Sequence, residues 1–322
     1  MKYSLIVPVY NRPEEVAVLL KSLESQDFTD FEAVIVEDGS TRKCDAVCAA
    51  AQERMALRYF YKENGGPGPA RNFAAERARG EYLIFLDSDV IVPPGYMSAV
   101  EAELSTAPAQ AFGGPDRAHA SFTPVQKAIN YSMTSFFTTG GIRGGKKKLD
   151  RFDPRSFNLG IRADLFRALG GFSQMRFGED IDLSIRIYRS GAACRLFPEA
   201  WVYHKRRTDF RKFFRQVQNS GRARIALWQR WPDSLKIVHL FPALFTLSCI
   251  TVVIPLCYAL LIFIHATLVN RSLQVGLLSV PAAFIQLTGY GTGFLSEWWK
   301  VCVCKDRQER TFGKDFEEKF YK

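Results

Sequence analysis

The first two thirds of the chain alternate short apolar runs with stretches of helical periodicity. Apolar runs of four to eight residues bounded by turn residues are typical of buried strands, and apolar residues three and four apart indicate amphipathic helices. This alternation predicts an α/β fold with a largely parallel, doubly wound sheet. The expected strands are 3–9, 31–36, 57–61 and 81–86, and the expected helices are 13–26, 42–54 and 70–79, the last opened by Pro69.

Polar residues stand where several of these apolar runs end. Tyr10 and Asn11 follow the first strand, Asp38 ends the second, and Asp87-Ser88-Asp89 follows the fourth. Open α/β sheets bind ligands at the carboxyl ends of their strands. Two carboxylates one residue apart suit a hard divalent cation that keeps coordination positions free for phosphates. The alternative is a simple turn, because Asp and Ser are ordinary turn residues.

The basic charge of the chain is concentrated in one segment. The net charge is +10 over 322 residues, yet residues 1–204 contain 25 basic and 25 acidic side chains. Residues 205–236 contain ten basic side chains and two acidic ones. Such a segment could attract nucleic acid, but the apolar sequence that follows it favours anionic lipid as its partner.

Two long apolar stretches follow the basic segment. Residues 240–264 exceed the ~20 residues that cross a bilayer, and Pro242 and Pro255 would bend a helix there without excluding one. Residues 273–295 are more polar, so a re-entrant or interfacial segment is the alternative to a second span. Basic residues before the first stretch and after the second predict that both termini are cytoplasmic. No secretory signal precedes the first strand.

Two other local patterns each have two interpretations. Residues 140–155 are rich in glycine and lysine, which indicates either a solvated loop or a lid over an anionic substrate. Cys44 and Cys48 fit one helix face in a reduced compartment, with a disulfide or metal site as the alternative.

Six short motifs occur in sequence along residues 3–206. They are Val7-Pro-Val-Tyr-Asn11, Glu37-Asp-Gly-Ser40, Asn64…Ala70-Arg-Asn72, Asp87-Ser-Asp89, Gly170-Gly-Phe172 and Gly178-Glu-Asp180. In this order they are typical of family-2 glycosyltransferases, which this chain resembles over residues 3–206. The resemblance implies the nucleotide-diphospho-sugar-binding fold called GT-A. It also implies a membrane-associated, inverting enzyme that uses a divalent metal, Mn or Mg.

The resemblance implies a donor site at the strand ends. Tyr10 would support the nucleotide base, or else cover the core as a strand-end aromatic residue. Asp38 would accept a hydrogen bond from the imide N–H of the base, which favours a UDP-sugar. Arg71 would lie close to the nucleotide, or else be an exposed helix arginine. The implied donor-binding residues are Pro8, Tyr10, Asn11, Asp38, Arg71, Asp87 and Ser88.

The resemblance also implies a metal site beside the donor. Asp89 would be the direct ligand that links the metal to the diphosphate, and Asp87 would lie next to the ribose and the metal. His204 would be a further ligand, since neutral imidazole coordinates Mn-type ions acceptably. The alternative for His204 is a structural histidine.

The carboxyl-terminal motif carries the implied catalytic residues. Asp180 resembles a base that accepts the proton of the acceptor hydroxyl, and Glu179 would be its hydrogen-bonded or acceptor-binding neighbour. The alternative is that these acids only stabilise the first turn of a helix. Asp182 and Arg186, four residues apart, are expected to pair on the helix surface.

One departure from the superfamily pattern bears on the product. Processive polymer synthases carry Gln-x-x-Arg-Trp, whereas this chain has Gln229-Arg230-Trp231 without the spacer, which argues against a polymer-threading channel. Residues 207–231 instead have the pattern of an amphipathic helix on anionic lipid. The expected domains are a catalytic domain (1–206), a basic interfacial segment (207–236), a transmembrane hairpin (237–296) and a cytoplasmic tail (297–322).

The leading hypothesis is therefore an enzyme of a bacterial inner membrane, with its catalytic domain in the cytoplasm. It would transfer sugar from a nucleotide-diphospho-sugar to a hydroxyl of a membrane or lipid-linked acceptor. The nearest alternative is a polyprenyl-phosphate sugar synthase, whose ionised acceptor needs no base. A non-catalytic membrane scaffold is a third reading. A dehydrogenase is disfavoured because no Gly-x-Gly-x-x-Gly follows the first strand.

Overall fold

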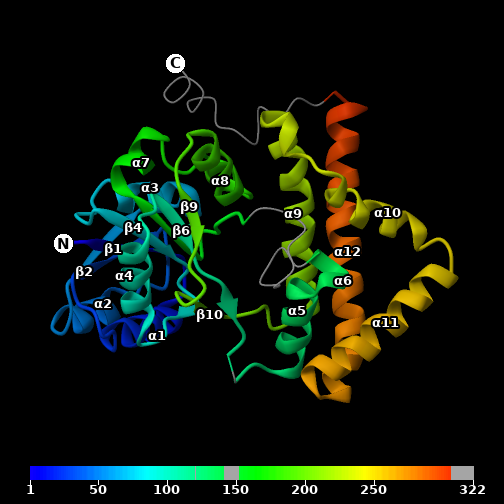
Figure 1. Cartoon of the computed structure of the whole chain (residues 1–322), viewed down its shortest axis with the longest axis horizontal. Coiled ribbons are helices and arrows are strands. Elements are labelled where there is room, and N and C mark those ends of the chain that lie inside the picture. The colour runs from blue at the N-terminus through cyan, green and yellow to red at the C-terminus, as the bar shows by residue number, and fades with distance from the viewer. Residues whose placement is uncertain (120, 141–151, 306–322) are drawn as a thin grey trace. The chain divides into compact units, whose positions relative to one another are not determined.

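The structure, a computed structural model, describes residues 1–119, 121–140 and 152–305. The described residues form two compact units (Figure 1). The first comprises residues 1–117 and 152–204, and the second comprises residues 118–119, 121–140 and 205–305. The expected catalytic domain 1–206 therefore differs from the first unit, because residues 118–119 and 121–140 belong to the second unit.

A seven-stranded sheet in the order β3-β2-β1-β4-β8-β6-β9 is the centre of the first unit. The four neighbouring strands β3, β2, β1 and β4 are parallel, whereas β8 is antiparallel to both β4 and β6. The predicted α/β fold with a largely parallel sheet is thus confirmed. The strands are β1 (Tyr3–Val9), β2 (Phe31–Asp38), β3 (Leu57–Lys62), β4 (Tyr82–Leu86), β6 (Ala111–Gly113), β8 (Asn158–Arg162) and β9 (Cys194–Leu196).

Helices cover both faces of this sheet because successive strand residues point to opposite faces. Leu5 belongs to one buried cluster with Leu19 of α1, whereas Ile6 belongs to another with Leu183 of α8. The helices of the first unit are α1 (Pro13–Glu24), α2 (Asp45–Gln52), α3 (Pro67–Ala75), α4 (Tyr96–Thr106), α7 (Ala163–Ala168) and α8 (Glu179–Arg189).

A second, three-stranded sheet lies beside the ends of the main strands. It consists of β5 (Val90–Ile91), β10 (Val202–His204) and β7 (Asp116–Arg117), with β10 in the middle. Since β5 begins one residue after Asp89, its pairing with β10 brings two distant parts of the chain to the end of β4.

Helix α3 begins earlier than predicted. It starts at Pro67 rather than at residue 70, so the expectation that Pro69 opens the helix was wrong. Gly66, at φ 93°, supplies the left-handed backbone just before the helix, and Pro67 has the φ angle that a first helical residue needs.

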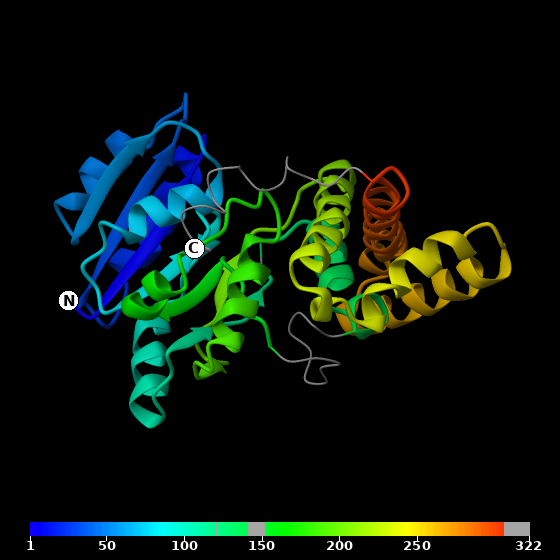
Figure 2. The ribbon, with the colours of Figure 1, turned by 90° about the horizontal axis from the view of Figure 1, so that it is seen from above.

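The second unit is a bundle of helices around α12. Helix α12 contacts α5, α9, α10 and α11, and it runs beside α9 in both views (Figure 1, Figure 2). A Cβ on Gly293 would lie 2.1 Å from the carbonyl oxygen of Gln218, so glycine is required for this close approach. The helices are α5 (Pro124–Thr134), α6 (Phe136–Thr139), α9 (Phe210–Arg230), α10 (Phe241–Ser248), α11 (Val253–Asn270) and α12 (Leu273–Cys302).

The first apolar stretch is divided into two helices. Helix α10 ends at Ser248 and α11 begins at Val253, so a single helix over 240–264 was a wrong expectation. Pro255 lies in the first turn of α11, where its missing N–H leaves no helical bond unmade. Helices α11 and α12 are apolar enough and long enough to be candidate membrane spans.

Helix α9 (Phe210–Arg230) confirms the prediction of a helix within 207–231. Its apolar face, however, is not exposed to lipid as predicted. Phe213 and Val217 are buried in a cluster with Ala282 of α12, and Ile225 is buried with Phe294 of the same helix. The amphipathic pattern of α9 is therefore satisfied by packing within the unit, and the lipid-facing interpretation of that face was wrong.

Candidate active site

Three potential metal ligands meet at the end of β4. Asp87 and Asp89 follow β4, and His204 ends β10, which pairs with β5. One ligand atom from each residue lies within 4.8 Å of the others. Nε2 of His204 is 3.3 Å from Oδ1 of Asp89 and 3.8 Å from Oδ2 of Asp87. Two carboxylates and an imidazole are a donor set that fits a Mn-type ion.

His204 lies in a largely buried, acidic environment. Its Nδ1 is 3.8 Å from Oδ2 of Asp116, and its ring stacks on Phe157 with 4.9 Å between centroids. Burial alone would lower the pKa of His204, but Asp116 and Asp89 outweigh it and raise the pKa to about 9. Without a metal, the imidazole therefore carries a proton at neutral pH, and a metal ligand at this position must first lose that proton.

Asp89 also forms an ion pair with Arg12, which the sequence analysis did not identify. Nη1 of Arg12 donates to Oδ2 of Asp89 at 2.7 Å. Burial favours the protonated form of Asp89, but His204 and then Arg12 outweigh it and hold the pKa of this carboxyl far below its usual range. The sequence signal was the position of Arg12 directly after the Tyr10-Asn11 motif.

Arg71 connects the metal-binding region with the carboxyl-terminal motif. From α3, its Nη2 donates to Oδ1 of Asp87 at 2.7 Å and its Nη1 donates to Oε1 of Glu179 at 3.1 Å. Its side chain is only 4% exposed, so the alternative of an exposed helix arginine was wrong. Burial, and then the charge of Asp180, raise the pKa of Glu179 to about 7 despite the nearby Arg71.

Glu179 and Asp180 begin α8 because the preceding Gly178 has a left-handed backbone, with φ 86°. Oδ2 of Asp180 lies 3.2 Å from Nη1 of Arg155, another residue that the sequence analysis missed. Arg155 belongs to the segment before β8, where no periodic pattern marks a functional residue. The two acids of the motif therefore each have an arginine partner, Arg71 for Glu179 and Arg155 for Asp180.

The expected surface pair of Asp182 and Arg186 is in fact buried. The side chain of Asp182 is fully buried, and its Oδ2 accepts a hydrogen bond from Nη2 of Arg186 at 2.8 Å. Arg186 also donates to the carbonyl oxygen of Leu169. The pair fixes α8 against the preceding turn, and the prediction of a solvent-exposed position was wrong.

Asp38 organises the loop before α3. Its Oδ1 accepts from Nζ of Lys62 at 2.8 Å and from the N–H of Gly65 at 2.9 Å. Its Oδ2 accepts from the N–H of Gly66 at 2.8 Å. A carboxylate has about four lone-pair sites, so these three bonds leave one site for a further donor.

The remaining predicted donor-binding residues lie around the end of β1. Pro8 is within β1, Ser88 is buried between the two acids, and the ring of Tyr10 is 53% exposed. Asn11 has a left-handed backbone, and its Oδ1 accepts from the N–H of Thr41 at 2.8 Å. Asn11 thus braces the loop after β2, and Tyr10 is free to contact a ligand.

Two other expectations concern segments near this site. The proposed lid residues 141–151 lie outside the described residues. The thiols of Cys44 and Cys48 are buried and unoxidised, with 3.8 Å between their sulfur atoms.

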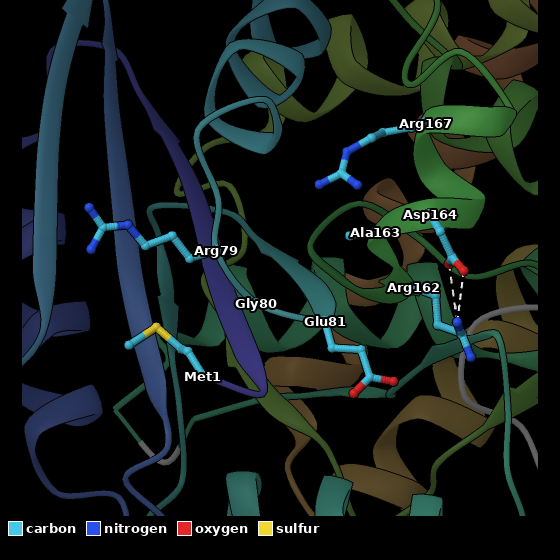
Figure 3. A pocket seen from close by; sticks show the side chains of 8 residues that line it. All are labelled: Met1, Arg79, Gly80, Glu81, Arg162, Ala163, Asp164 and Arg167. Carbon is cyan, nitrogen blue, oxygen red and sulfur yellow. Dashed lines mark hydrogen bonds and ion pairs between the residues drawn. The ribbon is translucent and has the colours of Figure 1, made fainter.

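A pocket of about 340 Å³ lies at the amino-terminal ends of β1 and β4, opposite the strand ends that carry the predicted site residues (Figure 3). Its lining includes Gly80 and Glu81 before β4 and Arg162 at the end of the antiparallel β8. Arg162 and Asp164, side by side in the pocket lining, form an ion pair with 2.7 Å between Nη2 and Oδ2. None of the predicted site residues lines this pocket, so the candidate active site is the acid- and arginine-rich rim at the other end of the strands.

Comparisons with known proteins agree with this fold. The model of the family described as "Glycosyl transferase family 2" matches residues 4–170. The poly(ribitol-phosphate) beta-N-acetylglucosaminyltransferase TarS of Staphylococcus aureus is 42% identical over 28% of this chain and 16% of its own length. The GalNAc(5)-diNAcBac-PP-undecaprenol beta-1,3-glucosyltransferase of Campylobacter jejuni is 31% identical over 35% of this chain. That match spans 37% of the Campylobacter protein, so the chain aligns with well under half of either relative.

The mannosyltransferase PcManGT of Pyrobaculum calidifontis, solved in complex with GDP-Man and Mn²⁺, is a structural neighbour. Its TM-score is 0.61 at 18% identity, over 93% of this chain and 87% of the neighbour. At this identity the likeness concerns the fold.

Proposed function

The chain belongs to glycosyltransferase family 2, as its motif order predicts, and from that premise we propose that it transfers a sugar from a nucleotide-diphospho-sugar to a hydroxyl group. The acceptor in this proposal is a membrane component or a lipid-linked glycan. The observation that carries the proposal is the double contact of Arg71, which donates to Asp87 and to Glu179. Arg71 thereby joins Asp87, which is assigned to the donor, with Glu179, which is assigned to the acceptor, in one proposed site.

The donor would bind at the rim formed by the ends of β1, β2 and β4. Asp87, Asp89 and His204 would hold Mn or Mg, whose charge would neutralise the diphosphate and the departing nucleotide. The one free lone-pair site on Asp38 suits a single N–H of the base, and the exposed ring of Tyr10 suits stacking on it. Uracil offers such an imide N–H, so a UDP-sugar is the favoured donor.

The reaction would be a single displacement. The acceptor oxygen attacks the anomeric carbon as the bond from that carbon to the diphosphate oxygen breaks, and the bonding electrons leave with the nucleotide. The proton of the hydroxyl passes to the carboxylate of Asp180, the base at the start of α8. One displacement inverts the anomeric configuration, and no enzyme nucleophile is needed.

A phosphate acceptor remains a second candidate because of Arg155. Its guanidinium lies 3.2 Å from Asp180, where it could equally face an anionic acceptor such as a polyprenyl phosphate. That acceptor is already ionised, so the transfer would not depend on a base. The dependence of turnover on Asp180 distinguishes the two candidates.

Membrane association is part of the proposal. Helices α11 and α12 would form the hairpin, and the exposed basic side chains of α9, among them Arg211 and Arg215, would favour anionic lipid. The name of the Campylobacter relative, with its undecaprenol-linked substrate, supports a lipid-linked acceptor. The catalytic unit and both termini would then be cytoplasmic, at a bacterial inner membrane.

The test is a transfer assay with the full chain in lipid nanodiscs. A panel of UDP- and GDP-sugars is incubated with Mn²⁺ or with EDTA, in the presence and absence of a bacterial lipid extract. We expect release of nucleoside diphosphate from one sugar donor, dependent on both Mn²⁺ and the extract, and a product of inverted configuration by NMR. Failure to release nucleotide from any donor would contradict the proposal, as would release that does not respond to the extract.

A further inference from the structure

Arg12 occupies a position that the proposed reaction does not yet explain. It is the residue just before α1, with its backbone outside the helical region at φ −137° and ψ 50°. The preceding Asn11 anchors it, because the side chain of Asn11 accepts from the N–H groups of Thr41 and Arg42. This anchor holds Arg12 at the rim, where its Nη1 reaches Oδ2 of Asp89.

Both carboxylate oxygens of Asp89 have a nitrogen partner. Oδ2 accepts from Arg12 at 2.7 Å, and Oδ1 lies 3.3 Å from Nε2 of His204. The side chain of Asp89 is 14% exposed, so its negative charge needs such partners. A divalent ion that uses Asp89 must compete with the guanidinium of Arg12, which stays charged at every accessible pH.

Arg12 is partly exposed at this contact. Its side chain is 35% exposed; its close ion pair is with Asp89, and Glu15 and Asp87 add smaller favourable charge interactions. A guanidinium that leaves a carboxylate can bind a diphosphate instead. Its planar fork of N–H groups makes paired, charge-assisted hydrogen bonds to phosphate oxygens as it does to carboxylate oxygens. Metal binding at Asp89 would free this guanidinium next to the incoming donor.

We propose that Arg12 is the counter-ion of Asp89 in the metal-free protein and a diphosphate-binding residue once the metal and donor are bound. The inference rests on the proposed function and adds a donor-binding residue to it. It assigns Arg12 two opposite effects, since the same side chain weakens the binding of metal alone and strengthens the binding of metal with nucleotide.

The test compares Arg12→Gln, Arg12→Lys and the matched control Arg42→Gln with the wild type, all as full chains in detergent. Arg42 is an exposed arginine of the neighbouring loop that pairs with Glu14. Binding of Mn²⁺ alone is followed by the EPR signal of free Mn²⁺. Binding of UDP and GDP in the presence of Mn²⁺ is measured by calorimetry, and thermal melting checks that each variant is folded.

For Arg12→Gln we expect Mn²⁺ alone to bind about two- to fivefold more tightly, the effect of losing one partly exposed ion pair. We expect the nucleotide with Mn²⁺ to bind about tenfold or more weakly, as for a lost hydrogen bond between charged groups. Arg12→Lys should keep the wild-type Mn²⁺ affinity, because it keeps the positive charge, and should bind the nucleotide more weakly because it loses the fork. Arg42→Gln should match the wild type in both measurements.

Mn²⁺ affinity that is unchanged or weaker in Arg12→Gln overturns the counter-ion role, and unchanged nucleotide affinity overturns the diphosphate role. A folded Arg12→Lys variant that binds Mn²⁺ as tightly as Arg12→Gln does also overturns the counter-ion role. These failures differ from a failure of the proposed function. In that case the wild type itself would bind neither Mn²⁺ nor either nucleotide.

Discussion

Nη1 of Arg155 lies 3.2 Å from Oδ2 of Asp180, with exposures of 22% and 17% for the two side chains. The acid proposed as the catalytic base therefore has the positively charged guanidinium of Arg155 beside it. Arg155 precedes β8 and Asp180 is the second residue of α8, so this contact joins two parts of the chain that the motif order alone does not bring together.

Asp180→Asn keeps the shape of the side chain but removes its ability to accept a proton. We expect turnover to fall by about 10²–10⁴-fold, the range that general-base catalysis supplies. Donor affinity should change little, because in the proposed reaction Asp180 faces the acceptor and not the nucleotide. Single-turnover kinetics and nucleotide titrations measure the two effects. Near-normal turnover would instead favour the phosphate acceptor.

Asp89→Ala removes a proposed metal ligand and the partner of both His204 and Arg12. We expect nucleotide binding to lose its dependence on Mn²⁺ and turnover to disappear, while the circular dichroism spectrum stays that of the wild type. Glu103→Ala, on the outer helix α4, is the control and should retain Mn²⁺-dependent binding. Unchanged nucleotide affinity with Mn²⁺ in Asp89→Ala would exclude Asp89 from the metal site.

Asp38→Ala should affect both binding and stability, because Asp38 holds the loop that begins α3. Loss of the bonds to Lys62 and to the N–H groups of Gly65 and Gly66 should cost about 2–4 kcal/mol of the free energy of unfolding. Nucleotide affinity should fall as well, since α3 carries Arg71. Thermal melting and calorimetry test this, with the exposed Asp45→Ala as control. A variant with normal melting but weak nucleotide binding would limit Asp38 to a role in base recognition.

The strands and their acid-bearing ends were predictable from the sequence for a physical reason. Buried parallel strands are continuous apolar runs, and their carboxyl ends meet at one rim, so Asp38, Asp87 and Asp89 had to lie near one another. Arg12 and Arg155 come from irregular segments. No periodicity marks such residues, and only the folded chain shows what they contact.

The helices of the second unit show a different limit. The amphipathic pattern of α9 indicates that one face is covered, but it does not say whether lipid or α12 covers it. Likewise, residues 240–264 are mostly apolar, so the stretch predicts one long helix. The polar Ser248 and Thr251 and the position of Pro255 were the signals of the break between Ser248 and Val253. The position of α3 was missed because Pro67 and Pro69 both suit a first helical turn.

The raised pKa of Glu179 predicts a pH dependence of stability. Its pKa is about 7 in the folded chain against an ordinary value of 4.5, so the folded state binds more protons than the unfolded state between these values. Stability from this group therefore falls as the pH rises from about 4.5 through about 7. Glu179→Gln lacks this titration, so its melting temperature relative to the wild type should increase between pH 5 and pH 8.

Glu76→Gln is the matched control for this measurement, since Glu76 is an exposed glutamate whose partner is the neighbouring Arg77. Its melting temperature should follow that of the wild type across the same pH range. A difference between Glu179→Gln and the wild type that is constant with pH would contradict the raised pKa. A difference that decreases with pH would give the opposite sign and show that Arg71 dominates the environment of Glu179.

The proposed transmembrane hairpin makes a prediction about chemical accessibility. In a chain whose exposed cysteines are replaced by serine, single cysteines are introduced at Lys212, Leu260 and Arg271. Lys212 is exposed on α9, Leu260 is exposed in the middle of α11, and Arg271 is in the turn between α11 and α12. We expect a membrane-impermeant maleimide to label Lys212→Cys from the cytoplasmic side and Arg271→Cys from the opposite side. Leu260→Cys should react only after detergent is added. The cysteines to be replaced are Cys249, Cys257, Cys302 and Cys304.

Each position decides a separate part of the topology. Labelling of Leu260→Cys without detergent would mean that the apolar surface of α11 faces water or another protein surface and not lipid. Labelling of Arg271→Cys from the same side as Lys212→Cys, with Leu260→Cys still protected, would mean that α11 enters the bilayer and returns. The expected result requires that α11 crosses the bilayer completely. A helix of 18 residues is about 27 Å long, which matches the hydrocarbon core of a thin bilayer. The basic residues at both ends of the proposed hairpin would then favour the orientation in which those ends are cytoplasmic.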